Sequence, residues 1–134
     1  MPLPATSELT DHLGFWLRAV SNHVSQAFAA SLATTGVTVA EWVMMRVLYG
    51  APPMAPSRLA ETMGMTRGAI TKLANRLIAK ALVARMASPN DARAQTLALT
   101  QAGEALVPKL AAIADRNDAD CFGNLSESDR AALN

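Results

Sequence analysis

The stretch from Pro56 to Lys80 constrains the fold most, because two short helical patterns meet there at a single glycine. Gly64 lies between them, where glycine can adopt the positive φ of a tight turn. Ala60 is small enough for a close helix crossing, and Ile70 can fill the junction. This spacing predicts a helix-turn-helix, although any small helical bundle would show part of it. The positions that fit the motif are Leu59, Ala60, Gly64, Met65, Ile70 and Leu73.

The second of these helices, expected over 67–80, has two unlike faces. If Ile70, Leu73 and Leu77 turn inward, the opposite face carries short polar, amide and cationic groups, which are the types that reach base edges and phosphates in a major groove. Gly68 would let the backbone approach the groove floor, or it merely weakens the helix by about 1 kcal/mol relative to alanine. The predicted DNA-binding residues are Thr66, Arg67, Gly68, Thr71, Lys72, Asn75 and Arg76.

The charge of the chain is unevenly distributed. The formal net charge is only +1, yet residues 54–95 hold seven Lys or Arg and two acids, a local charge of +5. The remaining residues carry five basic and nine acidic groups. A basic centre between acidic flanks suits phosphate binding. An ordinary solvated surface explains the same charge distribution equally well.

A hairpin pattern follows the second helix. Residues 82–86 and 96–100 form two short strand patterns around a polar turn. Asp91 and Arg93 lie at the turn, where an arginine can enter a narrow minor groove while the nearby carboxylate holds its guanidinium. The two residues are therefore also predicted to bind DNA, and an ordinary surface pair is the alternative.

Helical patterns flank this region on both sides. Apolar residues recur at helical spacing over 7–34, and Thr38 with Glu41 forms a capping box for the next helix. We expect Thr100 to cap a long helical pattern, in which Pro108 predicts a kink or a late start. We expect a single domain over 1–134, with supporting helices over 7–50 and 101–134 around a winged helix-turn-helix lobe over 54–100.

The order of these elements resembles the MarR (multiple antibiotic resistance regulator) family. Its most specific part is Asp91-x-Arg93, a short strand, and Leu99-Thr100-Gln101-Ala102-Gly103 at the start of a long helix. The resemblance implies a mainly α fold with a small β-hairpin wing, a winged helix-turn-helix with N- and C-terminal dimerisation helices. It implies a ligand-responsive homodimeric repressor that binds a pseudo-palindromic operator in double-stranded DNA. A winged-helix protein-interaction module that does not bind DNA is the alternative, which the local charge and Arg93 disfavour.

The resemblance also implies a pocket for a small aromatic or acidic effector. The candidate lining residues are Trp16, Trp42, Arg46 and Tyr49, with Arg46 placed to meet a carboxylate. Aromatic residues at helical spacing are more often core, so burial is the alternative for Trp16 and Trp42.

One position departs from the family pattern. Ala81 stands where the family commonly has glycine, between the recognition helix and the first wing strand. If the backbone needs a positive φ there, alanine is strained by about 1 kcal/mol, and otherwise the helix ends differently.

Other chemistries find no support in the sequence. The single Cys121 cannot form an intramolecular disulfide, and His12 and His23 are about three helical turns apart, too far to bind one metal ion. No catalytic, metal-binding or cofactor motif and no signal or membrane-spanning pattern is evident. We expect a cytoplasmic protein that is not an enzyme.

Overall fold

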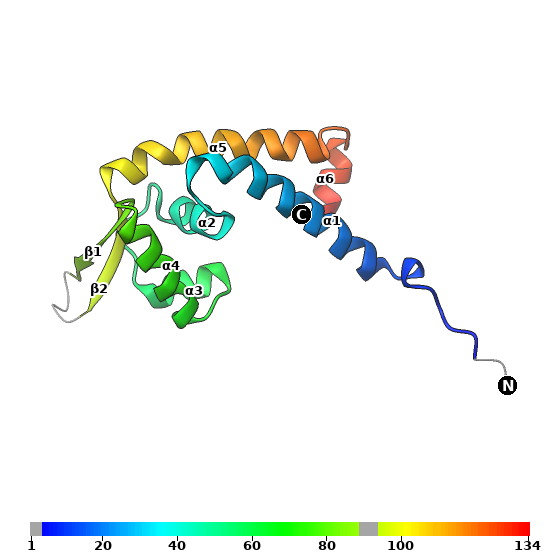
Figure 1. Ribbon diagram of the computed structural model, residues 1–134, viewed down its shortest axis with the longest axis horizontal. Helices are drawn as coiled ribbons and strands as arrows, with labels where there is room; N and C mark the ends of the chain where they lie inside the picture. The colour runs from blue at the N-terminus through cyan, green and yellow to red at the C-terminus, as the bar shows by residue number, and fades with distance from the viewer. Residues whose placement is uncertain (1–3, 89–93) are drawn as a thin grey trace.

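The computed structural model describes residues 4–88 and 94–134. It is mainly helical with one two-stranded antiparallel hairpin, which confirms the predicted fold class (Figure 1). Two 3-10 turns, Leu9–Asp11 and Ala33–Thr35, flank the first helix. The elements are α1 (Leu13–Leu32), α2 (Val39–Leu48), α3 (Pro56–Met63), α4 (Arg67–Ala79), β1 (Val83–Ala87), β2 (Gln95–Leu99), α5 (Gln101–Phe122) and α6 (Glu127–Leu133).

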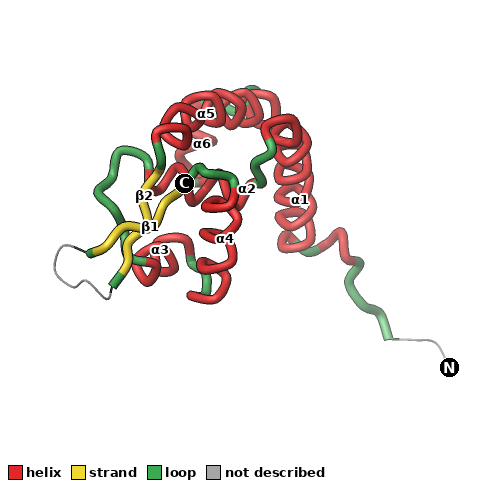
Figure 2. Tube along the Cα trace, turned by 60° about the vertical axis from the view of Figure 1, so that its left-hand side comes forward, coloured by secondary structure: helices red, strands yellow, loops and turns green. Residues whose placement is uncertain are grey.

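The helices form an elongated arm and a compact lobe. In the arm α1 and α5 lie side by side, as Figures 1 and 2 both show, and α6 lies at its far end (Figure 1). The lobe contains α2, α3, α4 and the hairpin, and it joins the arm where α1 ends and α5 begins. The molecule therefore has a compact lobe at one end and two extended helices at the other.

The helix-turn-helix forms as its spacing predicts. Pro56 occupies the first turn of α3, and Gly64 ends that helix with a φ of 64°. The Thr66 hydroxyl then accepts the Ala69 N–H at 3.1 Å and caps α4. Ile70 has no exposed surface and lies in the core between the helices.

The wing sheet differs from the prediction by one residue at each strand. The strands pair with Val83 opposite Leu99 and Ala87 opposite Gln95, so Thr100 lies outside the strand, and it caps α5 as expected. Met54 adds a short third segment, because its N–H and C=O exchange hydrogen bonds of 2.9 and 2.8 Å with Leu97. The sequence pattern did not indicate this segment.

The buried core sits in the lobe and at its junction with the arm. Leu32 at the end of α1 and Val107 and Leu110 near the start of α5 are buried. The N-terminal half of α1 contributes no buried residue, and its apolar side chains are exposed. The exposed apolar residues of this half and of the preceding turn are Leu9, Leu13, Phe15, Trp16, Leu17 and Val20.

The junction after α4 settles the question posed by Ala81. Its φ is 60°, so the backbone does take the left-handed conformation and the strain of about 1 kcal/mol applies. Helix α5 starts directly after Thr100 and runs through Pro108 without a break, so the expectation of a late start is wrong.

The start of α5 explains why a glycine follows Leu99-Thr100. The Thr100 hydroxyl donates to the Ala81 carbonyl at 2.7 Å and accepts the Gly103 N–H at 3.1 Å. A Cβ atom at Gly103 would overlap the backbone oxygen of Leu82. Only glycine allows the helix to approach the wing so closely.

We therefore expect Gly103→Ala to lower the free energy of unfolding by about 1–3 kcal/mol, because backbone atoms must move to relieve the overlap. Urea unfolding followed by circular dichroism measures the effect. Gly68→Ala is the matched control, since nothing lies within 4 Å of a Cβ at that helical site; it should leave stability unchanged or raise it by up to about 1 kcal/mol. Equal unfolding midpoints for wild type and Gly103→Ala would contradict the packing argument.

Candidate nucleic-acid interface

The outer side of α4 carries all seven residues predicted for this helix and its cap. Ile70, Leu73, Ala74 and Leu77 are buried against the lobe, and the residues between them face solvent. We call the exposed set the recognition face: Thr66, Arg67, Gly68, Thr71, Lys72, Asn75 and Arg76.

The cations of the recognition face have no carboxylate partner in the part of the chain that the structure describes. Within residues 4–88 and 94–134, Arg67, Lys72 and Arg76 form no ion pair with a carboxylate. Thr71 donates to the Arg67 carbonyl at 3.0 Å, which leaves its hydroxyl oxygen able to accept. A helix face with exposed cations and short polar groups matches the requirements for contacting phosphates and base edges.

Arg85 on β1 extends this surface and was not identified from the sequence as a site residue. Its guanidinium donates a hydrogen bond to Oδ1 of Asn75. Because a guanidinium only donates, the amide of Asn75 must present its oxygen to Arg85 and its NH₂ group elsewhere. The alternating pattern of the strand did not predict that Arg85 would contact α4.

The remaining predicted DNA-binding residues, Asp91 and Arg93, lie outside the described residues. The strands that lead to them project beside α4 from the same lobe (Figure 1). Their contact with DNA stays a prediction.

The C-terminal end of α4 is tied to the start of α2. Lys80, which follows the last residue of α4, donates from Nζ to both carboxylate oxygens of Glu41, at 2.7 and 2.9 Å. Glu41 has no exposed surface and also accepts the Thr38 N–H at 2.8 Å, completing the predicted capping box. Burial raises the pKa of Glu41, but the bonds from Lys80 and Thr38 outweigh it and hold the pKa below its usual value.

This shift predicts how stability depends on pH. With the pKa of Glu41 lower in the folded chain, the carboxylate stabilises the fold above about pH 4.5, and this contribution is lost as the pH falls through the folded pKa. Glu41→Gln should cost about 1–2 kcal/mol at pH 7, less than a fully buried pair would lose, because Lys80 remains partly in water. Urea unfolding at pH 7 and at pH 3.5 tests this. If the difference in free energy of unfolding between wild type and Glu41→Gln is the same at both pH values, the lowered pKa of Glu41 does not contribute to stability.

Three of the four predicted effector residues lie together on α2 and just after it. Trp42 and Arg46 line a hollow of about 390 Å³ with Val43 and Val47. The Arg46 guanidinium lies 5.7 Å from the centre of the Tyr49 ring, a cation–π arrangement.

Trp16 does not line this hollow. It lies near the start of α1, is 49% exposed, packs edge-on against Phe15 and donates to the Thr10 carbonyl at 2.8 Å. The alternative of a core residue is therefore wrong for Trp16 within one chain, whereas Trp42 is half-buried against the core.

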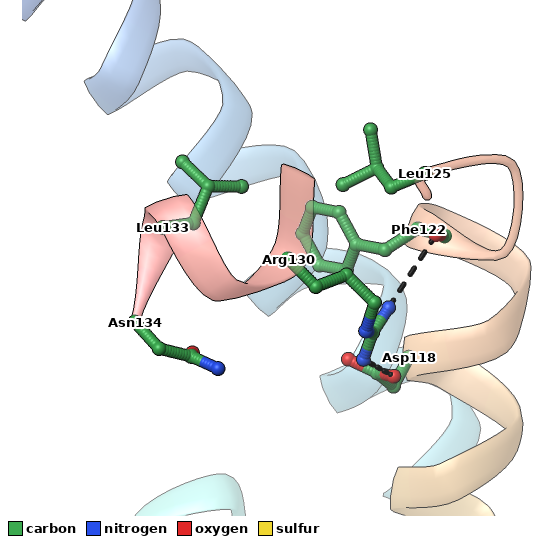
Figure 3. A pocket seen from close by; sticks show the side chains of 6 residues that line it. All are labelled: Asp118, Phe122, Leu125, Arg130, Leu133 and Asn134. Carbon is green, nitrogen blue, oxygen red and sulfur yellow. Dashed lines mark hydrogen bonds and ion pairs between the residues drawn. The ribbon is translucent and has the colours of Figure 1, made fainter. Parts of the chain in front are cut away.

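A second cavity, of about 210 Å³, lies where α5 meets α6. Figure 3 shows Arg130 reaching back to α5, where it pairs with Asp118 at 2.5 Å and donates to the Phe122 carbonyl at 3.4 Å. Leu125 and Leu133 form its apolar side. The Ser126 hydroxyl caps α6 by accepting the Asp129 N–H. These contacts fix the short last helix on the arm.

Within the described residues, no group of three or more His, Cys, Asp or Glu side chains could hold a metal ion. No single described helix is long and apolar enough to cross a membrane; only α1 and its 3-10 turn taken together with α2, across a 77° bend, meet the length and composition requirement.

Helix-turn-helix, hairpin and arm together define the class of winged helix-turn-helix transcriptional regulators. Residues 35–94 match the MarR family model. A Thauera aromatica protein named as a transcriptional regulatory protein for the hcr operon is 32% identical, across 97% of this chain and 84% of its own length. The chain belongs to the MarR family.

Further comparisons agree with this membership. An HTH-type transcriptional repressor of Mycobacterium tuberculosis is 29% identical, over 85% of this chain and 82% of its own. Among solved structures, CouR from Rhodococcus jostii RHA1 bound to p-coumaroyl-CoA superposes with a TM-score of 0.85 at 27% identity, covering 96% of this chain and 90% of that one.

Proposed function

We propose that this protein is a homodimeric, ligand-responsive transcriptional repressor that binds a pseudo-palindromic operator through α4. The observation that carries the proposal is the recognition face, on which Arg67, Lys72 and Arg76 are exposed without a carboxylate partner among the described residues. Such cations gain favourable phosphate contacts and release counterions from DNA. The seven residues of the recognition face, with Asp91 and Arg93 at the wing, are the proposed contacts.

The arm supports the homodimer. Its exposed apolar side chains, among them Leu13 at 74% and Leu17 at 59%, form a face that a single chain leaves in water. A second copy of the same face would bury it through a two-fold contact, and we expect that axis to place both α4 helices on one side of the dimer. Two recognition helices about 34 Å apart reach successive major grooves, which is why we expect an inverted repeat in the operator. In this division of roles, 7–50 and 101–134 supply the dimerisation and supporting helices, and 54–100 binds DNA.

The hollow on α2 supports the ligand response. Arg46 offers a cation to a carboxylate, and Trp42 offers an aromatic surface, so a small aromatic or acidic effector fits its chemistry. Because α2 packs against α1 and α5 of the arm, an effector there would favour dimer geometries in which the α4 helices no longer match the groove spacing. The protein acts by binding and not by catalysis, in the compartment that holds the DNA, which is the cytoplasm in a bacterial cell.

The pair of Arg85 and Asn75 refines how DNA is read. With its oxygen engaged by Arg85, Asn75 presents only NH₂ donors, and these suit acceptors such as purine N7, guanine O6 or thymine O4. Arg85→Ala should relax base preference at the position contacted by Asn75 by roughly tenfold, whereas Arg85→Lys, which keeps a donor, should relax it less. Binding to operators varied one base pair at a time measures this. If Arg85→Ala and Asn75→Ala relax different positions, the pairing does not serve DNA reading.

Selection of duplexes from a random library with the full-length protein tests the proposed function. Enrichment of an inverted repeat with half-sites about one helical turn apart is the expected result. A protein-interaction module that reuses the winged fold would enrich no sequence, and that result would overturn the proposal.

A further inference from the structure

The C-terminal end of α4 makes a contact that neither the fold class nor the recognition face explains. Lys80 Nζ donates three hydrogen bonds, to the Gly36 carbonyl at 2.6 Å and to the two Glu41 oxygens at 2.7 and 2.9 Å. Gly36 lies in the turn between α1 and α2, and Glu41 lies in the first turn of α2. All three donors of the ammonium group are thus directed at the corner where the arm meets the lobe.

The anchor on the α1–α2 corner is rigid. Glu41 is held in place from its own helix, because its carboxylate accepts the Thr38 N–H while its N–H bonds the Thr38 hydroxyl. It has no exposed surface, and the backbone reverses at Gly36 with a φ of 75°. A carboxylate fixed by its own capping box cannot follow Lys80 if α4 tilts.

The other side of the same junction is fixed to α5. Ala81, which keeps the strained φ of 60°, accepts a hydrogen bond from the Thr100 hydroxyl at 2.7 Å. The Leu82 N–H returns to the Leu77 carbonyl at 3.0 Å, and the Leu82 carbonyl accepts the Thr100 N–H at 3.0 Å. The end of α4 is therefore held by the α1–α2 corner on one side and by the start of α5 on the other, and α1 and α5 themselves pack together as the arm.

We propose that Lys80 is a positioning residue for DNA binding: its bonds to Glu41 and Gly36 fix the angle between the recognition helix and the dimerisation arm. This inference rests on the proposed function. In a homodimer that angle sets the separation of the two α4 helices, and so the spacing of half-sites that the protein accepts. Without the clamp, this end of α4 keeps its core packing and its bonds toward α5 but loses its tie to the α1–α2 corner, and it gains freedom to tilt.

Exposure separates this role from a contribution to stability alone. The Lys80 side chain is 38% exposed, so its ion pair contributes little to the free energy of unfolding compared with a fully buried pair. A small change in the angle of α4, in contrast, is amplified along the dimer into a mismatch with the groove. Lys80→Met keeps the aliphatic stem and removes only the three donors.

The test uses full-length protein and three duplexes: the repeat obtained by selection and versions with one base pair inserted or deleted between the half-sites. Wild type should bind the selected spacing at least about tenfold more tightly than the altered ones. Lys80→Met should lower affinity for the selected spacing by roughly tenfold and change the other two by less than about twofold. Lys80→Arg, which keeps charge and donors, should restore much of the discrimination, and Lys109→Met, an exposed lysine of α5, should behave as wild type.

Two results would overturn the inference. An equal loss on all three duplexes would make Lys80 a general phosphate contact, and unchanged binding on all three would leave it without a role in DNA binding. Failure of the wild type to bind any duplex would overturn the proposed function, and this inference with it.

A second measurement needs no DNA and covers the case in which Lys80→Met folds poorly. Spin labels at position 79 in a Cys121→Ser background report the distance between the two α4 helices of the dimer. Glu41→Gln, which leaves one acceptor for the helix cap, should broaden this distance distribution relative to wild type. An unchanged distribution in a folded Glu41→Gln dimer would contradict the clamp.

Discussion

Replacing Lys72 and Arg76 together by alanine is expected to lower affinity for duplex DNA by roughly 10²- to 10³-fold in low salt. Both cations are exposed on α4 and form no ion pair within the described residues, so each can neutralise a phosphate. A homodimer loses four such contacts, and each contributes about 0.9 to the slope of log affinity against log salt. The double variant should therefore show a slope shallower by about 3 to 4 units.

Fluorescence anisotropy with a labelled duplex at several salt concentrations measures both quantities. The matched control is Lys109→Ala with Arg116→Ala, which removes the same charge from exposed positions of α5. If the two double variants lose affinity equally, net charge and not the recognition face governs binding, and the assignment of α4 fails.

Replacing Leu17 and Val20 by glutamate is expected to convert the dimer into a monomer. Both side chains are at least half exposed in the single chain and belong to the apolar face of α1. Four carboxylates buried in the shared face would each have to be desolvated without a partner. Loss of the dimer also unlinks the two half-sites, so affinity for the full operator should fall by roughly 10²- to 10⁴-fold.

Sedimentation velocity reports the association state directly. Gln26→Glu adds one carboxylate at an exposed polar position of the same helix and should leave the dimer intact. A chain with both glutamates that still sediments as a dimer would show that the apolar face of α1 is not the interface, and another surface would have to be sought.

Local chemistry was readable from the sequence wherever neighbours in the chain settle the structure. Thr66 and Thr38 cap their helices through residues three positions away, and Gly64 turns the chain at one backbone position. The left-handed φ at Ala81 was likewise one of two stated alternatives, because it depends on how one helix ends. Strand ends were wrong by one residue, since Thr100 can extend a strand or cap a helix and packing against the Ala81 carbonyl decides.

Contacts between distant segments could not be read in this way. Glu41 was recognised as a capping residue, but its partner Lys80 comes from another helix far along the chain. The hydrogen bond from Arg85 to Asn75 depends on how the hairpin packs against α4. The spacing of apolar residues in the sequence does not predict that packing. Trp16 shows a further limit: its apolar spacing favoured burial, whereas the side chain is 49% exposed in the single chain. The spacing alone does not say whether the same chain or a second copy would cover such a face.

The central claim, that the recognition face binds DNA through its exposed cations, is tested most directly by the affinity of the wild-type protein for its selected duplex between about 50 and 200 mM salt. If four or more phosphates are neutralised per dimer, log affinity should fall linearly with log salt at a slope of about −4 or steeper. Binding that does not change with salt, or no binding to any duplex, would contradict the account.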